Sequence, residues 1–203
     1  MYIIGLTGGI GSGKTSVAQW FRGKDIPVLD ADAAVHQILD QDPLAARRLA
    51  EEFGARIIRD SKIDRMALGK IVFANDAARE RLESIIHPLV WTKMSEEEDA
   101  LRRMGRKLCI WDIPLLIEAG KHRQANEVWV VWASARVQIQ RVQQRSGLSE
   151  QDIRSRIQAQ MPLDLKRDLA DVVIDNAQDW QTTLVQLEEQ WHRLERMILR
   201  AES

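Results

Sequence analysis

Gly8-Gly9-Ile10-Gly11-Ser12-Gly13-Lys14-Thr15 is the stretch of sequence that decides the fold. It matches in full the phosphate-loop pattern of a glycine, four variable residues, and then glycine, lysine and a hydroxyl residue. An apolar run at 2–7 directly precedes the loop and a helical pattern directly follows it, which is the context that the motif requires. Glycines reach positive φ, so that successive amides can point inward and form a nest for an anion. The loop therefore predicts a site for the phosphates of a nucleoside triphosphate.

The end of the loop supplies side chains with predicted roles. Lys14 can reach the β- and γ-phosphates, and the hydroxyl of Thr15 is placed to ligate Mg²⁺. Ser16 can add a hydrogen bond to a phosphate oxygen, and the helix that begins near Lys14 adds its N-terminal dipole. The predicted nucleotide-binding residues of the loop are Gly11, Ser12, Gly13, Lys14, Thr15 and Ser16. NTPases, switches, motors and kinases share such loops, so the motif alone does not name a reaction.

Short apolar runs recur along the chain and are separated by helical patterns. They lie at 2–7, 26–29, 108–112, 127–132 and 172–175. Strands that alternate with helices imply a parallel sheet with right-handed crossovers. Residues 42–106, apart from a possible segment at 56–58, show no strand pattern and look like a helical insertion. We therefore predict the α/β class, with a P-loop NTPase-like parallel five-stranded sheet flanked by helices.

Bulk composition limits the classes of partner. The 203 residues carry a formal net charge of −1, so no global field recruits nucleic acid or an anionic membrane. The chain shows neither an apolar run of membrane-spanning length nor the pattern of a signal peptide. Cys109 is the sole cysteine, which excludes an internal disulfide and fits a reducing compartment. We expect a cytoplasmic protein with no nucleic-acid, membrane or obligate protein partner.

Two carboxylates, Asp30 and Asp32, follow the run at 26–29. If the chain is still extended there, both side chains face the same cleft. A kinase needs a base or orienting group for the attacking hydroxyl and a carboxylate that helps to hold Mg²⁺. Asp30 could instead cap the helix predicted at 31–39. Asp32 lies beyond the cap position, so its place in the sequence favours a functional role over a capping role.

Together with further segments of the chain, the phosphate loop and the two carboxylates resemble the dephospho-CoA kinase family. The similar segments, in the family's order, are 4–14, 30–32, 87–89, 112–118, 160–163 and 170–176. The resemblance implies transfer of the γ-phosphate of ATP to the ribose 3′-hydroxyl of dephospho-CoA, the last step of coenzyme A synthesis. ATP is then the co-substrate, Mg²⁺ the metal and dephospho-CoA the small-molecule substrate.

The resemblance also implies a nucleotide-binding core, a helical substrate region and a mobile lid. We predict a single P-loop kinase domain over residues 1–203. Its nucleotide-binding core takes 1–41, 107–140 and 166–203, its substrate-binding insertion takes 42–106, and its lid takes 141–165.

Roles of individual residues are implied position by position. Asp32 matches the family's catalytic aspartate, as base or orienting group for the 3′-hydroxyl, and Lys14 is the second residue expected in catalysis. Arg145 is expected to contact ATP from the lid, and Asn176 is expected to lie beside adenine. The residues expected to bind substrate are His87, Glu118 and Arg141.

Some of these residues also have structural interpretations. Asn176 could cap a helix, and His87 could pack at a helix kink made by Pro88. Arg141 and the arginine four residues later could form a solvated basic face. Asp112, at a strand end, could bind Mg²⁺ through water or form a structural ion pair.

Two positions depart from the family pattern, and two other functions stay open. His36 stands where the family usually has arginine, which puts in question any phosphate or pantetheine contact of that arginine. Thr15 and Ser16 reverse the usual order of serine and threonine, although both can ligate Mg²⁺.

The two other functions that stay open are a small P-loop kinase for a nucleoside or nucleoside monophosphate, and a nucleotide-gated binding module.

Overall fold

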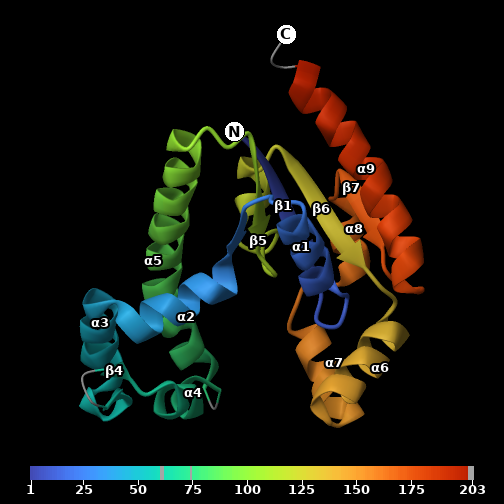
Figure 1. Ribbon diagram of the computed structural model, residues 1–203. Helices are drawn as coiled ribbons and strands as arrows, with labels where there is room; N and C mark the ends of the chain where they lie inside the picture. The colour runs from blue at the N-terminus through green and yellow to red at the C-terminus, as the bar shows by residue number, and fades with distance from the viewer. Residues whose placement is uncertain (60–61, 74, 201–203) are drawn as a thin grey trace. The chain divides into compact units, whose positions relative to one another are not determined.

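The structure, a computed structural model that describes residues 1–59, 62–73 and 75–200, contains a parallel sheet (Figure 1). Within that range its order of strands is β2 (Val28–Asp30), β5 (Leu108–Asp112), β1 (Tyr2–Gly8), β6 (Glu127–Trp132) and β7 (Val172–Asp175). β1, β5 and β6 are almost wholly buried, as expected for parallel strands covered on both faces. The predicted α/β fold with five strands is confirmed.

The register of the sheet places the loop that follows β1. In the parallel pairing of β1 with β5, Leu6 lies opposite Asp112, and in its pairing with β6, Gly8 lies opposite Val131. The loop therefore emerges next to Asp112 at the carboxyl edge of the sheet. Ligands of open parallel sheets bind at this edge.

The chain divides into two compact units. The first, which we call the sheet unit, comprises Met1–Val28 and Gly105–Ser203, and the second, the helical unit, comprises Leu29–Met104. The helices of the sheet unit are α1 (Lys14–Gly23), η2 (Lys121–Gln124), α6 (Ala135–Ser146), α7 (Glu150–Gln158), α8 (Leu163–Asp168) and α9 (Trp180–Arg200). Among the described residues, no helix is both long enough and apolar enough to cross a membrane.

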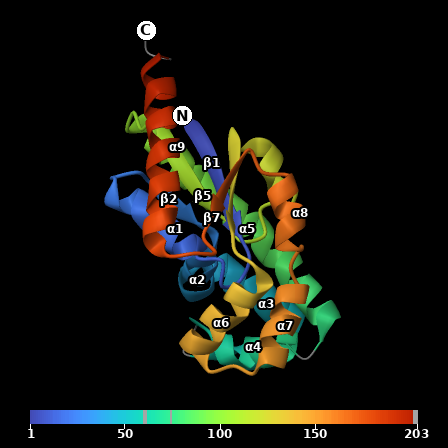
Figure 2. The same ribbon diagram turned by 90° about the vertical axis from the view of Figure 1, so that its right-hand side faces the viewer.

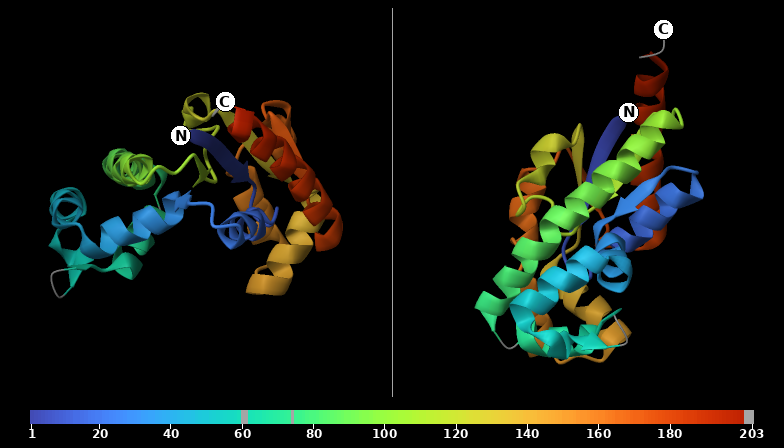
Figure 3. Two further views of the ribbon diagram at one scale, coloured as in Figure 1. Left: turned by 45° about the horizontal axis from the view of Figure 1, so that its top comes forward. Right: turned by 90° about the vertical axis from the view of Figure 1, so that its left-hand side faces the viewer.

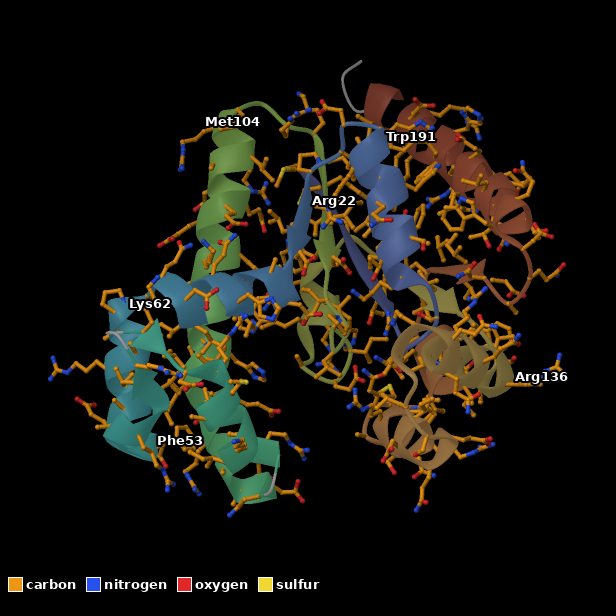
Figure 4. All side chains as sticks on the ribbon, turned by 60° about the horizontal axis from the view of Figure 1, so that its bottom comes forward. Arg22, Phe53, Lys62, Met104, Arg136 and Trp191 are labelled. Atoms are coloured by element: carbon orange, nitrogen blue, oxygen red, sulfur yellow. The ribbon has the colours of Figure 1, made fainter. Side chains whose placement is uncertain are left out.

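The core of the sheet unit forms where α1 and α9 cover one face of the sheet, while α8 lies on the other face (Figure 2). Phe21 of α1 packs against Trp129 of β6 with ring centroids 5.6 Å apart. Leu187 and Leu194 come from the apolar stripe of α9 and are fully buried. Trp191 of the same helix, labelled in Figure 4, packs against Trp20 of α1 with ring centroids 6.3 Å apart. The period-3.6 pattern of α9 therefore explains how this helix is held.

The helical unit packs around its longest helix, α5 (Asp76–Arg103) (Figure 3). Its other elements are α2 (Ala31–Gln41), α3 (Pro43–Phe53), η1 (Ala55–Ile57), β3 (Ile58–Arg59), β4 (Lys62–Ile63) and α4 (Arg65–Phe73). Asp42 caps α3 by accepting hydrogen bonds from the backbone N–H groups of Leu44 and Ala45, as the Asp-Pro signal predicts. The predicted boundaries of the insertion and the lid stay predictions.

Pro88 does not interrupt the helix in which it lies. α5 runs without a break through this residue, and Ile86, Val90 and Met94 are buried along one of its sides. Pro88 itself is exposed, so the carbonyl that lacks its N–H partner can bond to water instead. Packing of the apolar side holds the helix together across the proline.

An ion-pair network lies at the amino end of β6. Glu127 is 9% exposed and accepts both guanidinium donors of Arg193, the Trp129 Nε1–H and the Tyr2 hydroxyl. Burial raises the pKa of Glu127, but the hydrogen bonds from Arg193, Trp129 and Tyr2 outweigh burial and leave that pKa below its ordinary value. Burial and the hydrogen bond to Glu127 raise the pKa of Tyr2 to about 12.

Arg193→Met is expected to destabilise the fold by about 1–3 kcal/mol near neutral pH. This is less than the ~3–5 kcal/mol of fully buried pairs, because the side chain of Arg193 is 39% exposed. The folded pKa of Glu127 lies below its unfolded pKa, so the pair stabilises the protein above the unfolded pKa. That contribution is lost as pH falls through the folded pKa. Urea unfolding near neutral pH and in acid measures the difference in free energy of unfolding between the wild type and Arg193→Met, and this difference should shrink in acid. Arg196→Met, at an exposed position on the same helix, is the control.

Candidate active site

The phosphate loop has the geometry of an anion nest. Gly11 and Gly13 adopt φ of 74° and 96°, values in the left-handed region that favours glycine. The main-chain N–H groups of Gly11, Gly13, Lys14 and Thr15 donate to no other residue that the structure describes. Unpaired amides at a helix N-terminus attract negative charge. The loop thus offers several converging donors to a polyanion.

Side chains at the loop fit a nucleotide with a bound cation. Thr15 and Ser16 are exposed, so their hydroxyls are accessible to a ligand. The Oγ of Ser12 is buried and finds no hydrogen-bond partner among the described residues. Lys14 forms an ion pair with Asp112, which is 3% exposed. This pairing supports the interpretation of Asp112 as a structural ion pair.

Polar side chains hold the outer side of the loop. The Nε2 of Gln138 donates to the carbonyl of Ile10 at 2.7 Å, and the N–H of Ile10 donates to Oε1 of Gln160 at 3.0 Å. The Nδ2 of Asn176 donates to the carbonyl of Ser12 at 2.7 Å. The loop is therefore anchored by residues more than a hundred positions away in the chain.

Asn176 does not cap a helix. Asp179 fills that role at α9, where its Oδ1 accepts the N–H of Thr182 at 2.8 Å. Asn176 is 4% exposed, and its Oδ1 accepts the hydroxyl of Thr183 at 2.8 Å while its Nδ2 holds the loop. The capping interpretation is therefore wrong, and contact of Asn176 with adenine stays a prediction.

Gly13→Ala is expected to weaken nucleotide binding by about tenfold or more. A Cβ at Gly13 would lie 2.0 Å from Nδ2 of Asn176, so this side chain would have to leave the carbonyl of Ser12. The φ of 96° adds about 1–2 kcal/mol of backbone strain. Gly105→Ala is the matched control, because Gly105 has φ of 75° but open space around its Cβ. Calorimetric titration with ADP measures the effect, and equal affinities of the two variants would contradict it.

A buried lysine lies near Lys14. The side chain of Lys166, on α8, is 0% exposed and donates to Oε1 of Glu118 at 2.9 Å and to the carbonyl of Pro114 at 2.8 Å. Burial lowers the pKa of Lys166, the charge of Lys14 lowers it further, and Glu118 partly opposes both effects. Glu118 also accepts the N–H of Met161 at 3.1 Å. The structure thus fixes Glu118, expected to bind substrate, within this hydrogen-bonded group.

Arg141 and Arg145, both on α6, have different surroundings. Arg141 is partly buried, and its guanidinium lies 3.4 Å from the carbonyl of Ser12 and 3.3 Å from that of Gln178. Arg145 is exposed and forms no hydrogen bond or ion pair with the rest of the described chain. Arg141 therefore borders the phosphate loop, while Arg145 has a guanidinium that is accessible to a ligand.

Asp30, Asp32 and His87 belong to the helical unit. The Oδ1 of Asp30 accepts the N–H of Ala33 at 3.0 Å, which confirms its role as cap of α2. The chain is not extended through Asp32, because the helix predicted at 31–39 is present as α2, which begins at Ala31 and places Asp32 in its first turn. Residues two apart on a helix do not face each other. Asp32 and His87 are both exposed, so His87 does not pack at a kink.

Sequence reasoning missed the contacts of Gln138, Gln160 and Lys166. A glutamine or lysine among polar helical residues resembles a solvated side chain, so nothing local marks these positions. The segment 160–163 provided the one available signal, because it is similar to the dephospho-CoA kinase family.

Comparison with known proteins assigns this site to a family. The family model described as dephospho-CoA kinase matches residues 2–182. A dephospho-CoA kinase of Symbiobacterium thermophilum is 44% identical over 192 residues, which cover 94% of this chain and 80% of that protein. A solved structure from Thermus thermophilus shares 34% identity with a TM-score of 0.76, covering 95% of this chain and 97% of the other. The dephospho-CoA kinase from Campylobacter jejuni shares 25% identity with a TM-score of 0.73, covering 96% and 97%. The chain therefore belongs to the dephospho-CoA kinase family.

Proposed function

We propose that this protein transfers the γ-phosphoryl group of ATP to the ribose 3′-hydroxyl of dephospho-CoA, which yields coenzyme A and ADP. The observation that carries the proposal is the match to the dephospho-CoA kinase family over residues 2–182, which include the whole phosphate loop. Family membership does not favour a nucleoside kinase or a nucleotide-gated module. We expect the protein to act in the cytoplasm.

The phosphate loop is the donor half of the proposed site. The unpaired amides of Gly11, Gly13, Lys14 and Thr15 bind the phosphates, and the ammonium of Lys14 moves from Asp112 towards them. Ser12 and Ser16 are the other residues of the loop that are proposed to bind ATP. The guanidinium of Arg145 neutralises charge on the transferring group, and Asn176 lies near adenine. These roles extend the geometry of the loop to a bound nucleotide.

Mg²⁺ is proposed to accompany ATP. Mg²⁺ usually takes most of its ligands from water and substrate phosphates, with one or two from the protein. No group of three or more His, Cys, Asp or Glu side chains that could hold a metal lies in the described part of the chain. The exposed hydroxyl of Thr15 is the proposed protein ligand. The bound ion supplies charge that stabilises the phosphates during transfer.

The acceptor half of the site is proposed to begin at Asp32. Its carboxylate is exposed in the first turn of α2, where it can orient the 3′-hydroxyl and accept its proton. The transition state of phosphoryl transfer is loose, so orientation outweighs basicity. The residues proposed to bind dephospho-CoA are His87, Glu118 and Arg141.

Mass spectrometry of a mixture of the protein, ATP, Mg²⁺ and dephospho-CoA tests the proposal directly. Coenzyme A should form, and its amount should match the ADP measured by a coupled assay. A panel of nucleosides and nucleoside monophosphates serves as the competing set of acceptors. Turnover of a member of that panel without turnover of dephospho-CoA would overturn the proposal.

A further inference from the structure

The outer face of the phosphate loop is held by two buried amide side chains that donate to its carbonyl groups. Gln138 and Asn176 are 3% and 4% exposed. Gln138 donates to the carbonyl of Ile10, and Asn176 donates to that of Ser12, both at 2.7 Å. Arg141 also reaches the carbonyl of Ser12, at 3.4 Å. Burying these polar side chains is stabilising only because each finds its partner in the loop.

Each of these carbonyls shares a peptide plane with an amide of the nest. A trans peptide is planar, so its N–H points away from its C=O. The carbonyl of Ile10 is paired in this way with the N–H of Gly11, and the carbonyl of Ser12 with that of Gly13. Both N–H groups belong to the set that donates to no described residue. Holding the two carbonyls outward therefore fixes the direction of two phosphate-binding donors.

The peptide between Gly9 and Ile10 is turned the other way. Its N–H points outward to Oε1 of Gln160 at 3.0 Å, and its carbonyl accepts the N–H of Ser12 at 3.0 Å. Gln160 thus contacts the same loop residue as Gln138 but accepts where Gln138 donates. Two glutamines therefore bond the main chain of Ile10 with opposite roles, since Gln138 donates and Gln160 accepts.

Close approach of α6 to the loop is an independent feature. A Cβ at Gly11 would lie 2.7 Å from the main-chain carbonyl of Gln138, and a Cβ at Gly9 would lie 2.6 Å from its Nε2. Main-chain atoms inside a helix cannot shift easily, so the loop needs glycine at Gly11 for this contact as well as for φ of 74°. Glycines at these positions let α6 reach the loop.

We propose that Gln138 and Asn176 are positioning residues for phosphate binding, which turn the amides of Gly11 and Gly13 towards the phosphates. The inference rests on the proposed function for its role in catalysis, and its direct effect is on the affinity for nucleotide phosphates. Neither side chain needs to touch the nucleotide for this role. Free amides without a fixed direction would have to be ordered on binding, at a cost in affinity.

Isosteric variants separate donor from acceptor. Gln138→Glu replaces the donor to the carbonyl of Ile10 with a carboxylate, which repels that carbonyl. Gln160→Glu introduces the same charge at the same loop residue but keeps the acceptor for the N–H of Ile10, so it is the matched control. Asn176→Asp likewise removes the donor to Ser12 while keeping the acceptor for Thr183. Gln138→Met, which adds no charge, replaces Gln138→Glu if that variant does not fold by its thermal melt.

Calorimetric titrations with ADP and with AMP provide the readout. ADP presents its β-phosphate to the loop, whereas AMP lacks one. Gln138→Glu and Asn176→Asp should weaken ADP binding about 10–100-fold beyond the effect of Gln160→Glu. For Gln138→Glu, whose residue has no proposed contact with adenine, the change for AMP should be much smaller. Lowering the pH should restore ADP binding by Gln138→Glu relative to Gln160→Glu, because a protonated carboxyl group can again donate.

The results separate the inference from the proposed function. Equal losses of ADP affinity in Gln138→Glu and Gln160→Glu would overturn the inference, as would equal losses for ADP and AMP in Gln138→Glu. Recovery of Gln138→Glu in acid, with the loss confined to ADP, would support it. If the wild type binds ADP but makes no coenzyme A, the proposed function fails while these titrations still decide the role of Gln138 and Asn176.

Discussion

Lys14→Ala is expected to lower kcat/KM for phosphoryl transfer by about 10²–10³-fold. The ammonium of Lys14 lies at the phosphate loop, and its removal is expected to delete a charge-assisted contact to the β- and γ-phosphates. That contact strengthens as charge moves to the bridging oxygen, so kcat should fall as well as nucleotide affinity. A coupled assay for ADP, with dephospho-CoA as acceptor, measures both parameters.

Two variants make the result for Lys14 specific. Arg196→Ala removes a positive charge from the exposed side of α9 and should leave turnover near that of the wild type. Combining Lys14→Ala with Asp112→Asn separates the lost phosphate contact from the unbalanced charge of Asp112, because Lys14 pairs with that carboxylate. Near-native turnover of Lys14→Ala would show that the loop does not bind the phosphates as proposed.

Asp32→Asn is expected to lower kcat by about 10²–10⁴-fold while leaving ATP affinity nearly unchanged. The carboxylate is exposed in the first turn of α2, and the loop that binds ATP lies in the other compact unit of the chain. An amide can still hydrogen-bond the 3′-hydroxyl but cannot accept its proton at neutral pH. Titration with ATP and the formation of coenzyme A, followed by mass, measure the two effects separately.

Asp40→Asn is the matched control for Asp32→Asn. Asp40 lies on the same helix and is exposed, and its Oδ1 lies 3.8 Å from the Nε of Arg65. Its loss should cost less than about 1 kcal/mol of stability and leave kcat unchanged. If Asp32→Asn kept the turnover of Asp40→Asn, Asp32 would not be the catalytic carboxylate.

Elements that depend on near neighbours were predictable. The strands at 108–112, 127–132 and 172–175 lie where their apolar runs place them, and Asp42 before Pro43 caps α3, which is typical of an Asp-Pro pair. Burial on both faces makes such strands continuous apolar runs, and a cap needs only its own helical turn.

Elements that depend on packing between distant segments were not predictable from the sequence. α5 continues through Pro88 because its apolar side is buried, a fact that the local preference of proline does not contain. A cleft shared by Asp30 and Asp32 required an extended chain, and the predicted helix, capped by Asp30, begins between them at Ala31 instead. At Pro88 tertiary packing outweighed the local preference of the residue.

The sequence by itself determined the phosphate loop, the fold class and the family, because these depend on residues adjacent in the chain or matched in order. Only the tertiary structure decided how the loop is held. Gln138 and Asn176 stand 128 and 164 positions from the loop residues to which they donate. Steric limits and local hydrogen bonds set the conformation of a short segment, but the partner of a buried amide is set by which segments the sheet brings together.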